Sequence, residues 1–385
     1  RHYDLRELFS QNVVDEKIYL MHPIPGTRTP RSTFKPRPVR DADYTRLTVF
    51  LERQNFFPKL AKEMIVDAVR MVAEDNPHDP LADYLNGRPQ PTEDEARAIL
   101  ATWLVDYAGA EVAPMTGDAA DAGIHIKYLA QVGPKWLIGA VARALSPGCQ
   151  MDNSLIFEGW QGNGKSTMLR VLAGDQYFSD SLPDFHSDKA PMHITGKWVI
   201  EMAELTSVYK SAVEDMRRFL TRRIEQYKKP YDKSEIEYRR RCVFAGTTNR
   251  SDYLQDSEGE RRFWIVTCPN EIKLQELADN RDLIWGAAVA LYRSGEQWHL
   301  TDEEVKAYAL RVQKSRVAAE PWTDVLVPAL KHRDHVSIMD CYTVLCIDVD
   351  KQTSANKKRI VSILAADGFK KNGRFTSAKD GMNQW

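Results

Sequence analysis

The chain has 385 residues, of which 43% are hydrophobic and 28% are charged, and its formal net charge at pH 7 is −1. This length and composition are typical of a soluble globular protein with two or three domains. A net charge near zero excludes a global basic field, so any contact with nucleic acid has to come from local patches. The sequence contains neither a run of eighteen apolar residues nor a signal peptide, so it predicts no membrane span and no secretion.

The five cysteines are scattered and odd in number, which is typical of reduced cytosolic thiols. Two of them follow His332 and His335 at a spacing that matches no zinc site, so we expect Cys341 and Cys346 to be core residues of an apolar helix. The chain begins at Arg1 rather than Met, which is consistent with a fragment or a processed product of a longer protein.

Residues 1–123 are predicted to form a mostly helical region. Residues 1–40 show no clear period, and the Pro- and Arg-rich residues 23–38 predict an extended loop or linker. Apolar residues at three- and four-residue spacing predict helices over 41–54, 60–75 and 93–107, the last with a capping box at its start.

Residues 124–303 are predicted to form an α/β domain. A helical pair over 126–131 and 135–145 precedes four short apolar runs that alternate with helical stretches. This alternation predicts a parallel sheet covered by helices. The strand candidates are 155–157, 198–200, 243–245 and 263–266.

Residues 304–385 are predicted to form a small, mostly helical domain. Helices are expected over 322–330, 340–346 and 356–366, followed by a turn-rich hairpin near Gly368, Gly373 and Phe375. Three short helices and a hairpin are typical of a winged-helix-like fold.

Residues 159–166 read Gly-Trp-Gln-Gly-Asn-Gly-Lys-Ser, the pattern of a phosphate-binding P-loop. An apolar strand precedes it and a helical pattern follows, the context in which backbone N–H groups can wrap a polyphosphate. We expect Lys165 to reach the β and γ oxygens and the Ser166 hydroxyl to ligate Mg²⁺. The expected nucleotide-binding residues are Gly159, Gln161, Gly162, Asn163, Gly164, Lys165, Ser166 and Thr167.

The next apolar run ends in two carboxylates, Glu201 and Glu204, an arrangement typical of a Walker B strand. We expect Glu201 to lie at the metal, directly or through its water, and Glu204 to orient or activate the attacking water. The alternative interpretation is that either acid caps the next helix or lies in solvent.

A third apolar run ends in Asn249, as a sensor-1 strand does, and Asn249 would then position the water. A plain turn residue is the alternative. Arg261 and Arg262 stand between a glycine turn and an apolar strand, which suits an arginine finger offered to a neighbouring subunit. Such fingers accelerate hydrolysis by about 10³–10⁵. The alternative for one of them is a pair with a carboxylate of its own subunit.

Taken in order, these motifs resemble the virulence-associated protein E family, which is similar to the superfamily 3 helicases of the AAA+ ATPases. The resemblance covers roughly residues 75–300. It implies a P-loop AAA+ core, ATP and Mg²⁺ as cofactors, and a homo-oligomeric ring, usually of six subunits, that moves along DNA in the cytoplasm of a bacterial host. Related helicases carry adjacent acids at Walker B, whereas Glu201 and Glu204 are three apart. The segments that carry the resemblance are 159–174, 177–180, 198–205, 246–250 and 260–263.

Basic residues interleaved with tyrosines over 217–241 suit single-stranded DNA, because cations meet phosphates and rings stack on bases. By the family resemblance, Lys228, Lys229 and Lys233 form the basic tip of a hairpin that contacts DNA. The alternative is that the arginines at helical spacing (Arg217, Arg218, Arg222 and Arg223) form a solvated or intersubunit surface. The basic run 357–359 opens the presumed third C-terminal helix, where it suits either DNA contact or plain helix surface.

The leading hypothesis is an ATP-dependent DNA helicase of phage or mobile-element replication. The alternative is an ATP-gated DNA-binding initiator or regulator without unwinding activity. A small-molecule kinase that shares only the P-loop is disfavoured, because such an enzyme needs neither a sensor strand nor arginines supplied in trans.

Overall fold

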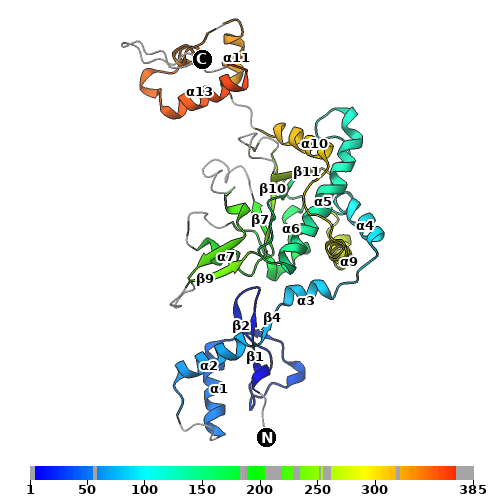
Figure 1. Ribbon diagram of the computed structural model, residues 1–385, viewed down its shortest axis with the longest axis vertical. Helices are drawn as coiled ribbons and strands as arrows, with labels where there is room; N and C mark the ends of the chain where they lie inside the picture. The colour runs from blue at the N-terminus through cyan, green and yellow to red at the C-terminus, as the bar shows by residue number, and fades with distance from the viewer. Residues whose placement is uncertain are drawn as a thin grey trace. The chain divides into compact units, whose positions relative to one another are not determined.

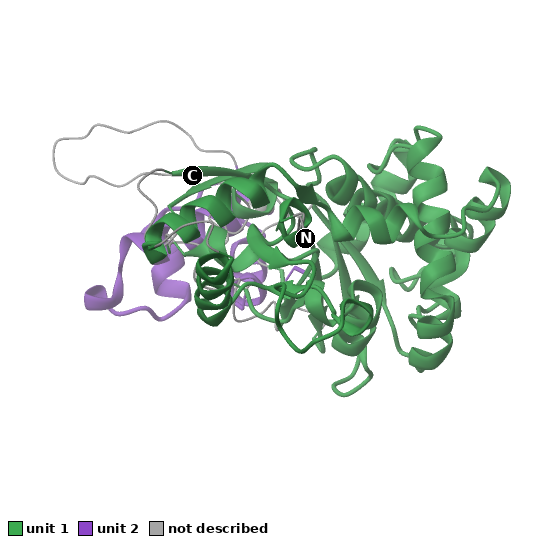
Figure 2. Ribbon diagram, turned by 90° about the horizontal axis from the view of Figure 1, so that it is seen from below, with its two compact units in different colours: residues 1–316 green, residues 317–385 purple. Residues whose placement is uncertain are grey.

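The computed structural model describes most of the chain and divides it into two compact units, residues 1–316 and 317–385 (Figure 2). Among the described helices, none combines the length and the apolar character needed to cross a lipid bilayer. The described residues are 5–54, 59–182, 187, 189–203, 218–228, 235–250, 253–254, 262–317, 321–333 and 335–369.

The first part of unit 1 is a small four-stranded sheet with the order β3-β2-β1-β4. Strand β1 pairs antiparallel with β2 and parallel with β4. The sequence shows no clear period over residues 1–40, so these strands were not predicted. The strands are only two to four residues long, too short for a periodic signal, and β1 pairs with residues more than sixty positions away. The strands are β1 (Phe9–Asn12), β2 (Lys17–Leu20), β3 (Arg37–Pro38) and β4 (Pro77–His78).

Two helices, α1 (Asp41–Arg53) and α2 (Lys62–Glu74), cover this sheet and confirm the predicted helices. Leu47 and Phe50 of α1 and Val69 of α2 are buried in one cluster with apolar residues of β1 and β2. The amphipathic spacing read from the sequence therefore corresponds to a core of this part's own.

Helices α3 (Pro80–Asn86), α4 (Glu93–Asp106) and α5 (Ala122–Leu145) lead to the central sheet. The capping box of α4 is present as predicted. The helical pair expected around residue 133 is one continuous helix, α5, with Pro134 inside it. Proline removes one hydrogen bond of the helix ladder, but α5 is buried almost throughout its second half, and this packing holds the helix together.

The central sheet has five parallel strands in the order β11-β5-β10-β7-β6 (Figure 1). The four predicted strands are confirmed, and the fold is a mixed α/β fold with a parallel sheet. Strands β5 and β10 are buried at every position, as expected for parallel strands covered on both faces. The strands are β5 (Ser154–Glu158), β6 (Phe178–Ser179), β7 (Val199–Ala203), β10 (Val243–Thr248) and β11 (Phe263–Thr267).

Strand order places a switch point beside β5. The chain leaves β5 for the far edge at β6, and later crosses from β10 to β11 on the other side of β5. In open α/β sheets, ligands bind outside the carboxyl ends of strands at such a point. The segment that follows β5 is the predicted phosphate loop.

Buried tryptophans fix the covering helices against the sheet and against one another. Trp136 of α5 donates its indole N–H to the carbonyl of Phe244 at 2.9 Å, and Trp285 of α9 donates to the carbonyl of Leu172 at 2.9 Å. These buried donors are paired, so the rings fix helix positions without leaving polar atoms unsatisfied. The other helices of unit 1 whose bounds lie within the described residues are α6 (Lys165–Ala173), α7 (Ala190–Ile194), α9 (Leu274–Arg293) and α10 (Glu303–Lys314).

Helix α10 packs on α5 and β11 within unit 1, whereas the sequence analysis placed residues after 303 in the C-terminal region. Its Tyr308 lies against His125 and Tyr128, with the Tyr308 and Tyr128 ring centroids 5.4 Å apart. The second compact unit begins only at Val317.

Strands β8 (Ile224–Tyr227) and β9 (Ile236–Arg239) form an antiparallel ribbon between the second and third predicted strands of the domain. A hairpin at this position was expected, and its tip over residues 229–234 lies outside the described residues.

Unit 2 contains α11 (Thr323–Leu330), α12 (Ile338–Val344) and α13 (Ser354–Ala366), which confirms the three predicted helices. Leu326, Cys341 and Ile360, one from each helix, are buried in one cluster. The predicted hairpin near Gly373 and Phe375 lies outside the described residues.

Candidate functional site

The candidate phosphate loop, residues 159–164, runs from the carboxyl end of β5 into the first turn of α6. Gly162 and Gly164 have φ angles of 83° and 86°, in the region that favours glycine. The loop is anchored at its start because the Gly159 N–H donates to the Thr248 carbonyl at 3.0 Å. The first N–H groups of α6 have no partner within the helix and carry its positive dipole end, so they suit an anion.

Lys165 is buried, with 8% of its surface exposed. Its ammonium donates to the carbonyls of Gly159 at 2.8 Å and Trp160 at 2.7 Å. The side chain therefore reaches from the first turn of α6 back to the start of the loop. Burial lowers the pKa of this ammonium, and the nearby Cys268 and Glu201 oppose that shift. A cation held among carbonyls inside the loop can exchange these neutral acceptors for phosphate oxygens.

Glu201 joins three elements at the carboxyl end of the sheet. Its Oε1 accepts hydrogen bonds from Ser166 Oγ and Thr247 Oγ1, each at 2.6 Å. Its other oxygen, Oε2, is buried and has no hydrogen-bond partner among the described residues. A buried carboxylate oxygen without a partner is costly, and hydroxyl and carboxylate oxygens are the ligands that Mg²⁺ prefers. The predicted pair, Ser166 and Glu201, therefore fits a magnesium ion.

Asn163 holds the loop against the neighbouring strand. Its amide donates to the carbonyls of Cys268 at 2.8 Å and Asn270 at 3.2 Å, just beyond the end of β11. A Cβ atom at Gly159 would meet the Cys268 carbonyl oxygen at 2.6 Å, so only glycine fits there. Gln161, Ser166 and Thr167 are exposed at the open side of the loop.

The remaining predicted catalytic residues are only partly described. Asn249 is exposed and directly follows β10, whose register places Thr248 beside Glu158 of β5. Arg262 is half-buried and directly precedes β11. Glu204 and Arg261 lie outside the described residues, so their roles stay predictions.

The basic segment before β10 is less available to DNA than its sequence suggests. Lys228 is exposed at the end of β8, and Lys229 and Lys233 lie outside the described residues. Arg240 is fully buried and pairs with Glu225, its Nε lying 2.6 Å from Oε1. Arg241 pairs with Asp79 at 2.6 Å.

The interpretation of residues 238–241 as part of a strand-binding surface was therefore wrong for Arg240 and Arg241. Tyr238 is buried as well, with its hydroxyl 3.3 Å from the Val14 carbonyl. The partners of these side chains come from other segments of the chain, so the basic run alone does not show that the side chains are buried.

Two residues at the strand ends were not singled out in the sequence. Thr247 donates a hydrogen bond to Glu201. The strand register brings the two residues together, because it places Ala245, two residues before Thr247, opposite Glu201. No local feature of the sequence pointed to this contact. Glu158, the last residue of β5, is nearly buried and pairs with Arg316, whose Nε lies 2.9 Å from Glu158 Oε1. Nothing in the local sequence connects residues 158 positions apart.

Glu158 sits directly before the phosphate loop and is held from three directions. Tyr253 donates its hydroxyl to Oε1 at 2.8 Å, and Thr267 donates to Oε2 at 3.0 Å. Burial, and then the Glu158 charge, raises the pKa of Tyr253 well above its ordinary value, so its hydroxyl stays protonated and donates. This network fixes the point from which the loop departs.

Replacing Arg316 with alanine is expected to lower the free energy of unfolding by about 3 kcal/mol, because the Glu158 carboxylate is left buried without its cation. The measurement is urea denaturation followed by tryptophan fluorescence. The control is Lys306→Ala, which removes an exposed pair with Glu303 and should change the free energy by less than about 0.5 kcal/mol. Equal effects of the two variants would show that Glu158 does not depend on its partner.

The cysteines do not form a metal site in the part of the chain described, where no cluster of three or more His, Cys, Asp and Glu side chains suits a metal ion. Cys341 is buried in α12, as expected for a core residue. Cys346 follows α12 and is exposed, so the expectation of a second core cysteine was wrong.

In unit 2, the basic run 357–359 lies in the first turns of α13, as predicted. Lys357 and Lys358 are exposed. The Arg359 guanidinium lies over the Trp322 ring, 4.0 Å from its centroid, and so also packs within the unit.

A family model described as the virulence-associated protein E-like domain matches residues 95–318. An apo structure of the NrS-1 C-terminal region (305–718) is 14% identical, covers 98% of this chain and 95% of that chain, and has a TM-score of 0.49. An A-form apo structure of the same region is 13% identical, covers 98% of this chain and 95% of that chain, and has a TM-score of 0.47. Among proteins of curated function, none matches the sequence.

Proposed function

The chain belongs to the virulence-associated protein E-like family, and on this premise we propose that it is an ATP-driven DNA motor of phage or mobile-element replication. ATP is hydrolysed to ADP and phosphate at the boundary between subunits of a ring, and the ring is proposed to have six subunits. The observation that carries the proposal is the meeting of Ser166, Glu201 and Thr247 beside the phosphate loop.

In this proposal the phosphate loop binds the triphosphate. The N–H groups of the loop and of the first turn of α6 donate to phosphate oxygens, and Lys165 moves from the loop carbonyls to the β and γ oxygens. Support comes from the burial of Lys165 and from the positive φ angles of Gly162 and Gly164, which a wrapped loop requires.

Ser166 and Glu201 would hold Mg²⁺, and the support for this is that Glu201 Oε2 is buried without a hydrogen-bond partner among the described residues. When bound, Mg²⁺ neutralises charge on the phosphates and polarises them. Thr247 keeps the Glu201 carboxylate oriented through its hydroxyl. Glu204 and Asn249 position and activate the water that attacks the γ-phosphorus, as the bond to the bridging oxygen of ADP breaks.

The finer fold assignment is part of the same proposal. Residues 124–316 would form a superfamily 3-like AAA+ core, residues 1–123 a collar, and residues 317–385 a winged-helix-like domain. The parallel sheet with the loop at its switch point supports the first of these. DNA would be held by the hairpin residues Lys228, Lys229 and Lys233, and Lys228 is exposed at the described end of that hairpin.

The experiment that tests this function compares wild-type protein with Glu201→Gln on a forked DNA duplex. Wild-type protein is expected to hydrolyse ATP and separate the strands. The variant keeps one acceptor oxygen for Ser166 and Thr247 but loses the charge at the metal, so we expect ATP turnover about 100-fold lower with ATP and DNA binding retained. The matched control is Glu276→Gln, an exposed acid on α9 that should leave turnover unchanged.

Two further measurements decide between motor and initiator. Mass measurement with an ATP analogue should show a ring, and a monomer that turns over ATP at full rate would contradict the proposal. Strand separation should be lost in Lys228→Ala/Lys229→Ala. ATP hydrolysis and DNA binding without any strand separation by wild-type protein would favour the alternative, an initiator that does not unwind DNA.

A further inference from the structure

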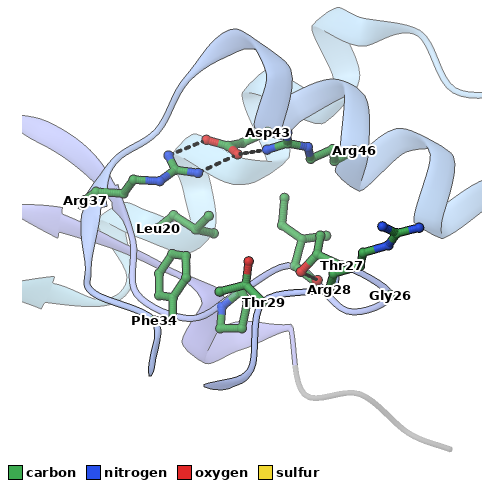
Figure 3. A pocket seen from close by; sticks show the side chains of 11 residues that line it. Leu20, Gly26, Thr27, Arg28, Thr29, Phe34, Arg37, Asp43 and Arg46 are labelled. Carbon is green, nitrogen blue, oxygen red and sulfur yellow. Dashed lines mark hydrogen bonds and ion pairs between the residues drawn. The ribbon is translucent and has the colours of Figure 1, made fainter. Parts of the chain in front are cut away.

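The N-terminal part of unit 1 contains a pocket of about 400 Å³ between the β2–β3 connection and α1 (Figure 3). Its volume is within the range of small-ligand sites, about 300–1,000 Å³. Its lining includes the apolar side chains of Leu20, Ile24 and Phe34 and the three arginines Arg28, Arg37 and Arg46, of which Arg37 and Arg46 form a cationic side around Asp43 (Figure 3). The sequence analysis assigned no function to this part of the chain.

The cationic side is organised by Asp43, which is almost fully buried. Arg37 binds both Asp43 oxygens, at 2.7 and 2.8 Å, and Arg46 contacts Oδ1 at 3.3 Å. The hydrogen bonds from Arg37 lower the pKa of Asp43, so this carboxyl is ionised at neutral pH. Figure 3 shows the Arg37 and Arg46 side chains directed toward Asp43, with Phe34 and Thr29 opposite them.

The pocket keeps a positive charge despite Asp43, because three guanidinium groups line it together with one carboxylate. Among the described residues, Arg28 has no ion-pair partner and is exposed. Arg46 uses one guanidinium nitrogen on Asp43, so its other N–H groups can donate to a ligand. An anion with several acceptor oxygens, such as a phosphate, matches this donor set.

The apolar part of the lining can receive a ring. Phe34 is half-buried, and the Arg37 guanidinium carbon lies 5.9 Å from its ring centroid. Leu20 and Ile24 are buried and form an apolar base to the pocket. Aromatic side chains stack on nucleic-acid bases whatever their sequence. The Thr29 hydroxyl has no partner among the described residues and can bind a phosphate or a base edge.

We propose that this pocket binds one nucleotide of a single-stranded DNA, with the phosphate on Arg28 and Arg46 and the base against Phe34. A strand is favoured over a free mononucleotide because the basic residues continue beyond the pocket. Residues 23–40 contain five cations and no acidic residue, and Arg31, Lys35 and Arg40 lie outside the pocket lining. This inference goes beyond the proposed function, because it needs neither ATP hydrolysis nor a ring.

The test measures binding of a fluorescein-labelled oligothymidylate to the full chain by fluorescence anisotropy, without ATP, over a range of salt concentrations. Arg28→Ala/Arg46→Ala is expected to bind about tenfold more weakly at low salt. The slope of log affinity against log salt should fall by about 0.7, since the pocket holds one phosphate and each phosphate contact to a single strand contributes about 0.7. Phe34→Leu, which keeps apolar volume but removes the ring, should weaken binding at least about fivefold.

The charge-matched control is Arg53→Ala/Arg70→Ala, which removes two exposed arginines from α1 and α2 outside the pocket. This control should leave both affinity and salt slope unchanged. Oligothymidylate carrying photoreactive 5-iodouracil should crosslink to the peptide that contains Phe34. ATP turnover without DNA should be the same in all pocket variants and wild-type protein, so failure here is distinguishable from failure of the proposed ATPase.

Four results would overturn the inference. The first is an affinity and salt slope of Arg28→Ala/Arg46→Ala equal to those of the control. The second is crosslinking confined to other segments of the chain. The third is competition by thymidine monophosphate as strong as by the oligonucleotide at equal nucleotide concentration, which would indicate a mononucleotide site. Competition by inorganic phosphate alone at that strength would likewise exclude a role for the base.

Discussion

ATP turnover by Arg262→Ala is expected to be about 10³-fold lower than that of wild-type protein, with ATP affinity unchanged. The reason lies in the register of the sheet. Phe263 pairs with Ser154 and Thr267 pairs with Glu158, so β11 and β5 start and end together. Arg262 precedes β11 and therefore lies at the amino edge of the sheet, whereas the phosphate loop leaves the carboxyl edge.

The five paired residues of these strands separate the two edges by about 13 Å, at about 3.3 Å per residue. An arginine side chain at one edge cannot span this distance through its own sheet. If Arg262 acts on the γ-phosphate, it must therefore act on a nucleotide bound by another copy of the chain. Its neighbour Arg261 carries the same expectation from the sequence.

Mixing two inactive variants tests this directly. In a mixture of Arg262→Ala and Lys165→Ala, some boundaries join an intact loop of the first variant to an intact arginine of the second, so part of the turnover should return. The control is Arg311→Ala, an exposed arginine paired with Asp121, which should be fully active alone. A mixture that stays as inactive as its components, or an active Arg262→Ala, would remove the assignment.

The second large effect is expected for Lys165→Ala, which should weaken ATP binding by about 10³-fold and abolish turnover at ordinary ATP concentrations. Two charge-assisted hydrogen bonds to phosphate oxygens, each about 1.5–3 kcal/mol, account for an effect of this size. The ammonium already lies inside the loop, on the Gly159 and Trp160 carbonyls, so its removal also leaves the loop without an internal cation.

The measurement is titration with a fluorescent ATP analogue in the presence of Mg²⁺, together with a turnover assay. Lys314→Ala, an exposed lysine at the end of α10, is the control and should bind the analogue like wild-type protein. Thermal unfolding of Lys165→Ala without nucleotide should match wild-type protein closely, since water can replace the ammonium at the loop carbonyls. ATP affinity within twofold of wild-type protein would contradict the role of Lys165.

Four of the five strands of the central sheet were predictable, because each is a short apolar run next to a turn or a polar end, whereas the two-residue strand β6 was not predicted. The loop after β5 was predictable because glycine spacing, strand and helix are all local features. The acid Glu201 was predictable in the same way, because it directly follows a short apolar run, although β7 continues two residues beyond it to Ala203. The partner of Glu201, Thr247, was not predictable, since the contact exists only when β7 and β10 lie side by side in one register.

Local sequence patterns gave wrong predictions where the interaction partners of a residue are distant in the sequence. Arg240 and Arg241 belong to a basic run that suggests a DNA surface, yet Glu225 and Asp79 bind them in the interior. The N-terminal sheet was not predicted, because its strands are short and its fourth strand, β4, comes after α1 and α2 in the chain. The cationic pocket was missed with it, because residues 23–38 show only composition and no period.

The sequence by itself determined the phosphate loop, the acid Glu201 after a short apolar run, and the alternation of strands and helices. These features depend on residues that are close together in the chain. The tertiary structure alone decided which oxygen of Glu201 remains without a partner, which arginines are withdrawn into the core, and on which edge of the sheet Arg262 lies. These properties depend on strand register and on burial, and both arise from contacts between segments that are distant in the sequence.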